Sequence, residues 1–180
     1  MVNIPNILTA VRFILIPIFG GYLYKEQYST AIILFVISGI TDILDGYIAR
    51  KFNMVTSFGK LADPVADKLM QITALVLLTL QDLIPVIVLI VVVAKEVFMG
   101  IGSISLYKRN VIVQASWYGK LATVVFYIAI IMTIIFKMKN FHNVYSDTIT
   151  SILISVAVVA ALFAFVMYVI SYRKISRESK

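Results

Sequence analysis

The 180-residue sequence contains no cysteine and a single histidine, His142. Disulfides and thiolate metal sites are therefore excluded, and one imidazole cannot form a histidine cluster. Charged side chains are scarce, since they make up 14% of the chain, whereas a soluble domain is about a quarter charged. Hydrophobic residues account for 61% of the chain, and the mean hydropathy is +0.98. This composition indicates a polytopic membrane protein with no room for a separate soluble domain.

Six apolar segments are each long enough to cross a bilayer as a helix, which takes about 20 residues. They are Ile7–Tyr24, Thr30–Ala49, Leu61–Leu80, Leu83–Leu106, Trp117–Phe136 and Thr148–Tyr172. Strands are disfavoured because open sheet edges cannot be satisfied in lipid. We therefore predict an all-α integral membrane protein with six transmembrane helices in a single domain, residues 1–180. A short interfacial segment is expected before the first span, because Pro5 suits a first helical turn and Asn3 and Asn6 can cap it or contact headgroups.

The formal net charge is +7, but the basic residues gather in short loops and at the C-terminus instead of forming one stripe. Nucleic-acid binding is therefore not expected. On one predicted face lie Arg50, Lys51, Lys60, Lys108, Arg109, Arg173, Lys174, Arg177 and Lys180, and on the other lie Lys25, Lys137 and Lys139. Because short cytoplasmic loops are enriched in Lys and Arg, this bias predicts a multi-pass protein of the cell membrane with both termini in the cytoplasm.

Four of the nine acidic residues fall within one stretch, Thr41 to Lys68. Asp42 and Asp45 are three positions apart, and Asp63 and Asp67 are four apart, so on helices each pair shares one face. The helices that carry the two pairs are joined by a short loop and are expected to be antiparallel neighbours. The four carboxylates can therefore converge at the cytoplasmic end of these helices.

Such a cluster calls for a cation, because four carboxylates near a membrane cannot all stay ionised without a counter-charge. Oxygen ligands without Cys or His favour Mg²⁺, Mn²⁺ or Ca²⁺ over zinc. Four carboxylates can hold two ions, as in phosphoryl displacement. Gly46, Ala49 and Gly59 leave space beside the aspartates, and Arg50 is a fork-shaped donor suited to a phosphate or nucleotide.

The spacing of these residues follows the pattern D-x-x-D-G-x-x-A-R, eight residues, then G-x-x-x-D-x-x-x-D. The matching residues are Asp42, Asp45, Gly46, Ala49, Arg50, Gly59, Asp63 and Asp67. This pattern resembles the signature of the CDP-alcohol phosphotransferase family, metal-dependent membrane enzymes that are commonly homodimers.

The resemblance implies two Mg²⁺ or Mn²⁺ ions bound by Asp42, Asp45, Asp63 and Asp67. It also implies that Asp67 is the general base toward the acceptor hydroxyl. Contacts to the CDP-linked donor, CDP-diacylglycerol in a membrane lipid pathway, are implied for Gly46, Arg50, Thr56 and Asn6, with Pro5 beside them.

A second segment, Lys108 to Phe126, resembles the branch of this family that makes phosphatidylglycerophosphate. Its matching residues are Lys108, Arg109, Ser116, Trp117, Gly119, Lys120 and Thr123, whereas Ala122 and Phe126 replace a lysine and a glutamine. Lys108, Arg109 and Lys120 are expected to hold the phosphate of glycerol 3-phosphate. The predicted reaction transfers the phosphatidyl group of CDP-diacylglycerol to glycerol 3-phosphate and releases CMP.

Two other functions remain open. The acceptor can instead be phosphatidylglycerol, as in CDP-diacylglycerol-dependent cardiolipin synthases, or another alcohol. A divalent-cation transporter is the alternative that is not an enzyme.

Lys95, Glu96 and Arg12 also lie inside apolar segments. Lys95 and Glu96 are expected either to line a polar cavity or to pair with Arg12 or with each other. Arg12 is expected to snorkel toward the headgroups, with a contact to the donor phosphate as the alternative.

Overall fold

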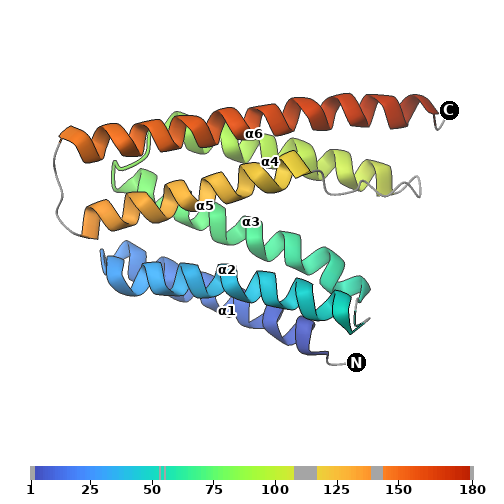
Figure 1. Cartoon of the computed structure of the whole chain (residues 1–180), viewed down its shortest axis with the longest axis horizontal. Helices are drawn as coiled ribbons and strands as arrows, with labels where there is room; N and C mark the ends of the chain where they lie inside the picture. Colours follow the sequence, from blue (N-terminus) through green and yellow to red (C-terminus); the bar gives the residue numbers. More distant parts are fainter. Residues whose placement is uncertain (1–2, 53, 55, 108–116, 139–143, 179–180) are drawn as a thin grey trace. The chain divides into compact units, whose positions relative to one another are not determined.

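A computed structural model of the chain describes residues 3–52, 54, 56–107, 117–138 and 144–178 (Figure 1). These residues form six α-helices and include no strand, so the protein is all-α as predicted. The helices are α1 (Ile4–Tyr24), α2 (Tyr28–Lys51), α3 (Ser57–Leu80), α4 (Val86–Tyr107), α5 (Trp117–Met138) and α6 (Val144–Glu178). Two compact units contain them, one built around α1–α3 and the other around α4–α6. The single domain over residues 1–180 stays a prediction.

Each predicted apolar segment corresponds to one helix, with ends that differ by a few residues. At the N-terminus the helix starts earlier than the predicted segment, because α1 begins at Ile4 with Pro5 in its first turn. Proline is tolerated there because the first turn needs no N–H donor. The expected segment is therefore continuous with the first turn of α1, and its interfacial placement stays a prediction.

Among the described residues, four helices are long and apolar enough to cross a membrane by length and composition. The spans are Pro5–Tyr24, Tyr28–Ala49, Trp117–Met138 and Tyr145–Arg173. They identify an integral membrane protein. The first half of α3 carries Lys60, Asp63, Asp67 and Lys68, which lowers its mean hydropathy. Six spans therefore stay a prediction.

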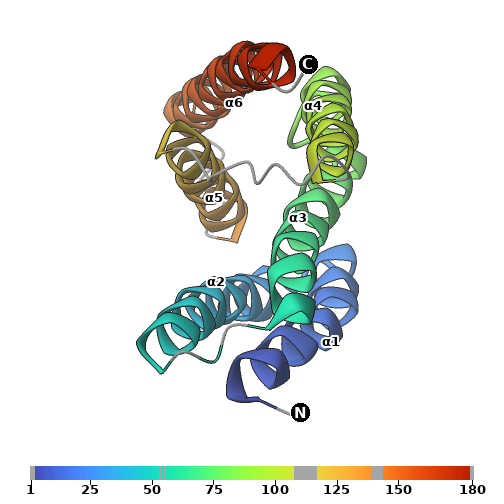
Figure 2. The same ribbon diagram turned by 90° about the vertical axis from the view of Figure 1, so that its right-hand side faces the viewer.

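In the N-terminal unit α1 packs against both α2 and α3 (Figure 2). Phe19 of α1 and Phe35 of α2 are fully buried, and their ring centroids lie 5.4 Å apart. Gly20 faces α3 closely, because a Cβ there would lie 3.3 Å from Cγ2 of Thr73. Small residues let helix backbones approach in membranes, so the middle of this unit is apolar and tightly packed.

The two ends of this unit are chemically different. Only residues 25–27 connect α1 to α2, which makes these helices antiparallel. Beside this turn, Gln81 at the end of α3 donates through Nε2 to the Leu23 carbonyl at 2.7 Å. Tyr28 donates from its hydroxyl to Oε1 of Gln81 at 3.2 Å. The starts of α1 and α3 and the end of α2 therefore lie together at the opposite end, where the aspartates are.

In the C-terminal unit α4 packs against α6. The Tyr168 hydroxyl donates to the Met99 carbonyl at 3.1 Å. A Cβ at Gly102 would lie 2.5 Å from that hydroxyl, so a larger residue there would force the tyrosine ring to shift. Lys95 and Glu96 form an ion pair at 2.6 Å. Their pairing with each other is therefore confirmed, whereas the polar cavity and the pairing with Arg12 stay predictions.

Candidate active site

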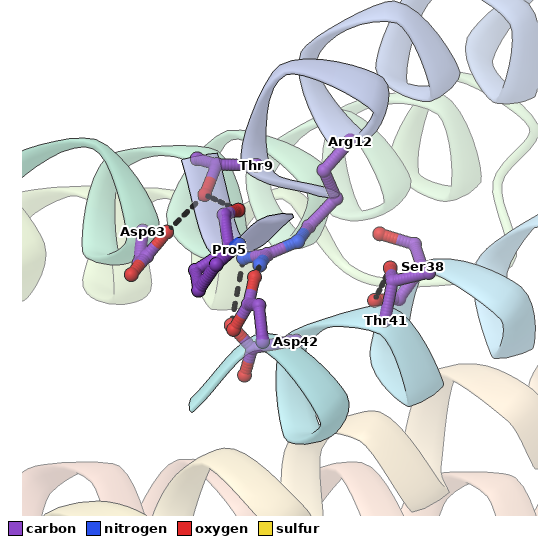
Figure 3. A network of polar contacts seen from close by, with 8 residues as sticks. Pro5, Thr9, Arg12, Ser38, Thr41, Asp42 and Asp63 are labelled. Atoms are coloured by element: carbon purple, nitrogen blue, oxygen red, sulfur yellow. Dashed lines mark hydrogen bonds and ion pairs between the residues drawn. The ribbon is translucent and has the colours of Figure 1, made fainter. Parts of the chain in front are cut away.

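Seven polar residues gather where α1 and α3 begin and α2 ends, and we call this cluster the polar junction. Figure 3 shows the part of it around Thr9, Arg12, Asp42 and Asp63. Its members are Asn6, Thr9, Arg12, Asp42, Asp45, Thr56 and Asp63. The three from α1 are spaced by three positions, which places them along one side of that helix. This side contacts both helices that carry the signature aspartates.

Arg12 joins α1 to α2 through two carboxylates. Its Nη1 donates to Oδ1 of Asp42 at 2.7 Å, and its Nη2 donates to Oδ2 of Asp45. The Arg12 and Asp45 side chains are 1% and 2% exposed, whereas that of Asp42 is 41% exposed. The snorkelling expected for Arg12 is therefore wrong, because two carboxylates on adjacent turns of α2 supply its counter-charge inside the protein.

Thr9 joins α1 to α3. Its hydroxyl oxygen lies 2.5 Å from Oδ1 of Asp63 and 3.0 Å from the Pro5 carbonyl oxygen. A hydroxyl has a single hydrogen, which these two acceptors share. The contact holds the Asp63 carboxylate against the first turns of α1 (Figure 3).

Asn6 and Thr56 make the outermost contact between α1 and α3. Thr56 is the N-cap of α3, and its hydroxyl oxygen accepts from the Gly59 amide at 2.9 Å while it donates to Oδ1 of Asn6 at 2.8 Å. A Cβ on Gly59 would lie 3.1 Å from the Thr56 hydroxyl and 3.2 Å from Oδ1 of Asn6. The signature glycine therefore lets the start of α1 approach α3.

The four aspartates are close enough to act on one another. Asp42 interacts electrostatically with Asp63 and Asp67, and Asp45 interacts with Asp63. Across the described residues, however, no group of three or more acidic or histidine side chains stands ready to hold a metal ion. The structure thus brings the predicted carboxylates to one end of the unit and does not itself test their metal ligation.

The chemistry of this donor set fits a hard divalent cation. All four side chains offer oxygen atoms only, which Mg²⁺ and Mn²⁺ prefer. Asp42 and Asp45 already share one cation, the Arg12 guanidinium. The two carboxylates can therefore hold positive charge between them.

For the remaining predicted site residues the structure describes only part of the side chains. Gly46 is half-buried in α2 beside Asp45, and Arg50 belongs to the last turn of α2, with its side chain outside the described part of the structure. Lys108 and Arg109 lie outside the described residues. Lys120 is exposed in the first turn of α5, in the C-terminal unit. The acceptor contacts stay a prediction.

Thr9 and the inward orientation of Arg12 are what sequence reasoning missed. A signal was present, because Asn6, Thr9 and Arg12 recur every third residue in a helix that is otherwise apolar. Ionisable residues inside apolar spans usually face a protein interior and mark functional sites.

Comparison with known proteins agrees with the signature. Residues 2–169 match the CDP-alcohol phosphatidyltransferase family. Three bacterial relatives each bear the name CDP-diacylglycerol–glycerol-3-phosphate 3-phosphatidyltransferase. The protein of Bacillus subtilis (strain 168) is 37% identical over 68% of this chain and 72% of its own. That of Haemophilus influenzae (strain Rd) is 35% identical over 92% and 91%, and that of Aquifex aeolicus (strain VF5) is 28% identical over 98% and 99%. The chain therefore belongs to the CDP-alcohol phosphatidyltransferase family of transferases.

Proposed function

We propose that this membrane enzyme transfers the phosphatidyl group of CDP-diacylglycerol to glycerol 3-phosphate, giving phosphatidylglycerophosphate and CMP. The observation that carries the proposal is the polar junction, where α1 binds both helices of the family signature at Asp42, Asp45 and Asp63. The names of the relatives, which match up to 98% of the chain, support the same acceptor.

Enzymes of this family depend on divalent metal ions. Two Mg²⁺ or Mn²⁺ ions would be held by Asp42, Asp45, Asp63 and Asp67, because these oxygen donors fit such ions. When bound, the ions neutralise charge on the diphosphate of the donor lipid.

The protein's own residues then bind the donor and move the proton. Gly46, Arg50, Thr56 and Asn6 contact the CDP-linked donor, and Thr56 already donates a hydrogen bond to Asn6 in the junction. Asp67 accepts the proton of the acceptor hydroxyl. The acceptor oxygen forms a bond to the phosphorus that carries the diacylglycerol, the bond from that phosphorus to the CMP oxygen breaks, and CMP leaves.

This chemistry takes place at the cytoplasmic surface of the cell membrane in our proposal. The Lys and Arg bias of the loops supports that orientation, and both termini would be cytoplasmic. CDP-diacylglycerol would reach the site from the surrounding bilayer. The enzyme would act as a homodimer, as is common in the family.

The acceptor is tested by measuring CMP release from purified protein with CDP-diacylglycerol and Mg²⁺ or Mn²⁺. We expect release with glycerol 3-phosphate and none with inositol, serine or inositol phosphate. Release with phosphatidylglycerol instead would identify a cardiolipin synthase and point to Ala122 and Phe126 as the cause. Ion flux in vesicles without CMP release under any condition would favour the transporter.

Lys120→Ala tests the acceptor phosphate contact. We expect the KM for glycerol 3-phosphate to rise about tenfold, because a hydrogen bond to a charged group is lost, while kcat and the KM for CDP-diacylglycerol change less than about twofold. Lys137→Ala is the matched control, since it removes the same charge from the last turn of the same helix. An unchanged KM in Lys120→Ala would remove this lysine from the acceptor site.

A further inference from the structure

The Arg12 guanidinium contacts two of the four aspartates that are proposed to bind metal. It contacts Asp42 and Asp45 through two different nitrogens, Nη1 and Nη2. The arginine is 1% exposed, so water cannot screen its charge from these carboxylates. The two acidic side chains therefore have an internal counter-cation in Arg12.

Arg12 is bound in a way that allows release. Its Nε is buried and has no hydrogen-bond partner among the described residues, and the same holds for the hydroxyl oxygen of Ser38. Ser38 lies four positions before Asp42, on the same side of α2. The two carboxylates are thus the recorded hydrogen-bond partners of the guanidinium. The Ser38 hydroxyl, on the same face of α2 as Asp42, is an acceptor without a recorded partner.

The rest of the α1 contact does not depend on Arg12. Thr9 contacts Asp63, and Asn6 accepts from Thr56. These two contacts join α1 to α3, whereas Arg12 joins α1 to α2. Weakening the Arg12 contacts therefore leaves α1 attached to the start of α3.

We propose that Arg12 is a positioning residue that acts as a resident counter-cation. It holds Asp42 and Asp45 together in the metal-free enzyme, and a divalent ion displaces it from at least one of them. The inference rests on the proposed ligation of metal by these aspartates. Two cations that share the same oxygens repel each other, so Arg12 opposes metal binding while it keeps the ligands in place.

The test is the dissociation constant for Mn²⁺, measured from the electron paramagnetic resonance of free Mn²⁺ with full-length protein in lipid nanodiscs and no substrate. In Arg12→Gln we expect the constant to fall about tenfold, within the usual range of coupling between two sites. Lys25→Gln is the matched control, because it removes one positive charge beyond the far end of α1, and we expect no change there.

A second readout separates competition from simple structural support. Metal-free Arg12→Gln should have a lower Tm than the metal-free native protein, and saturating Mn²⁺ should raise its Tm by more than it raises the native Tm. If Arg12→Gln does not fold, Arg12→Lys replaces it. That variant keeps the charge but loses the fork that spans two carboxylates, and its Mn²⁺ constant should fall about threefold, within the same coupling range.

The outcomes distinguish the inference from the proposed function. Native protein that binds Mn²⁺, together with an Arg12 variant whose constant is unchanged or higher, overturns the counter-cation role and leaves the proposed metal site intact. Native protein that binds no Mn²⁺ overturns both.

Discussion

Asp67→Asn is expected to lower kcat by about a thousandfold, with the protein still inserted in the membrane and its Tm little changed. A positioned general base contributes a factor on the order of a hundred to ten thousand, and a carboxamide cannot accept the proton of the acceptor hydroxyl. Asp67 is half-buried near the start of α3, and it interacts electrostatically with Asp42. The measurement is CMP release at saturating substrates and metal.

The matched control is Asp82→Asn, the same substitution just beyond the far end of α3. Asp82 is exposed and has a φ of 57°, which asparagine also tolerates, so activity should stay within about twofold of native. If Asp67→Asn keeps more than about a tenth of native turnover, Asp67 is not the base. Activity recovered by raising the Mn²⁺ concentration would assign Asp67 to metal binding alone.

The helices were predictable because lipid leaves a backbone few choices. Segments with about 20 apolar residues must satisfy their N–H and C=O groups internally, and each predicted segment is a helix in the structure. Helix ends were less predictable. The helix α3 starts at Ser57, capped by Thr56, because a cap extends a helix into polar sequence that hydropathy does not detect.

The candidate site was predictable where its geometry is local. Spacings of three and four within one helix place Asp42 beside Asp45 and Asp63 beside Asp67, and no tertiary information is needed for that. The partner of Arg12 could not be found in this way. A lone arginine in an apolar span can snorkel or pair internally, and the choice depends on which face of α2 meets α1.

The contribution of α1 is therefore the main addition from the structure. The family signature runs from Asp42 to Asp67 and includes no residue of α1. Yet Thr9 and Arg12 make the contacts that the structure records for Asp63, Asp42 and Asp45 in the junction. The first helix adds its own contacts to a candidate site that the signature defines only on two helices.

Asp45→Ala should be the most destabilising single change in the polar junction. It removes the carboxylate from a pair in which both side chains are at most 2% exposed. Breaking a buried pair costs up to about 3–5 kcal/mol, and here Arg12 is left with only the partly exposed Asp42 as its counter-charge. Asp42→Ala is the comparison, since the Asp42 side chain is 41% exposed and its loss should cost only about 1 kcal/mol. The Tm is measured in EDTA, which removes any contribution from metal binding.

A double variant decides whether the cost comes from the charge left behind. The double variant Arg12→Met/Asp45→Ala removes both charged groups of this pair, so neither is left buried alone. Its Tm should therefore exceed that of Asp45→Ala. The coupling between the two substitutions, read from the double-mutant cycle, should be about 2 kcal/mol or more. If the losses of stability from the two single substitutions simply add in the double variant, Arg12 and Asp45 stabilise the fold independently. If Asp42→Ala and Asp45→Ala lose equal stability, burial does not set the strength of the two contacts.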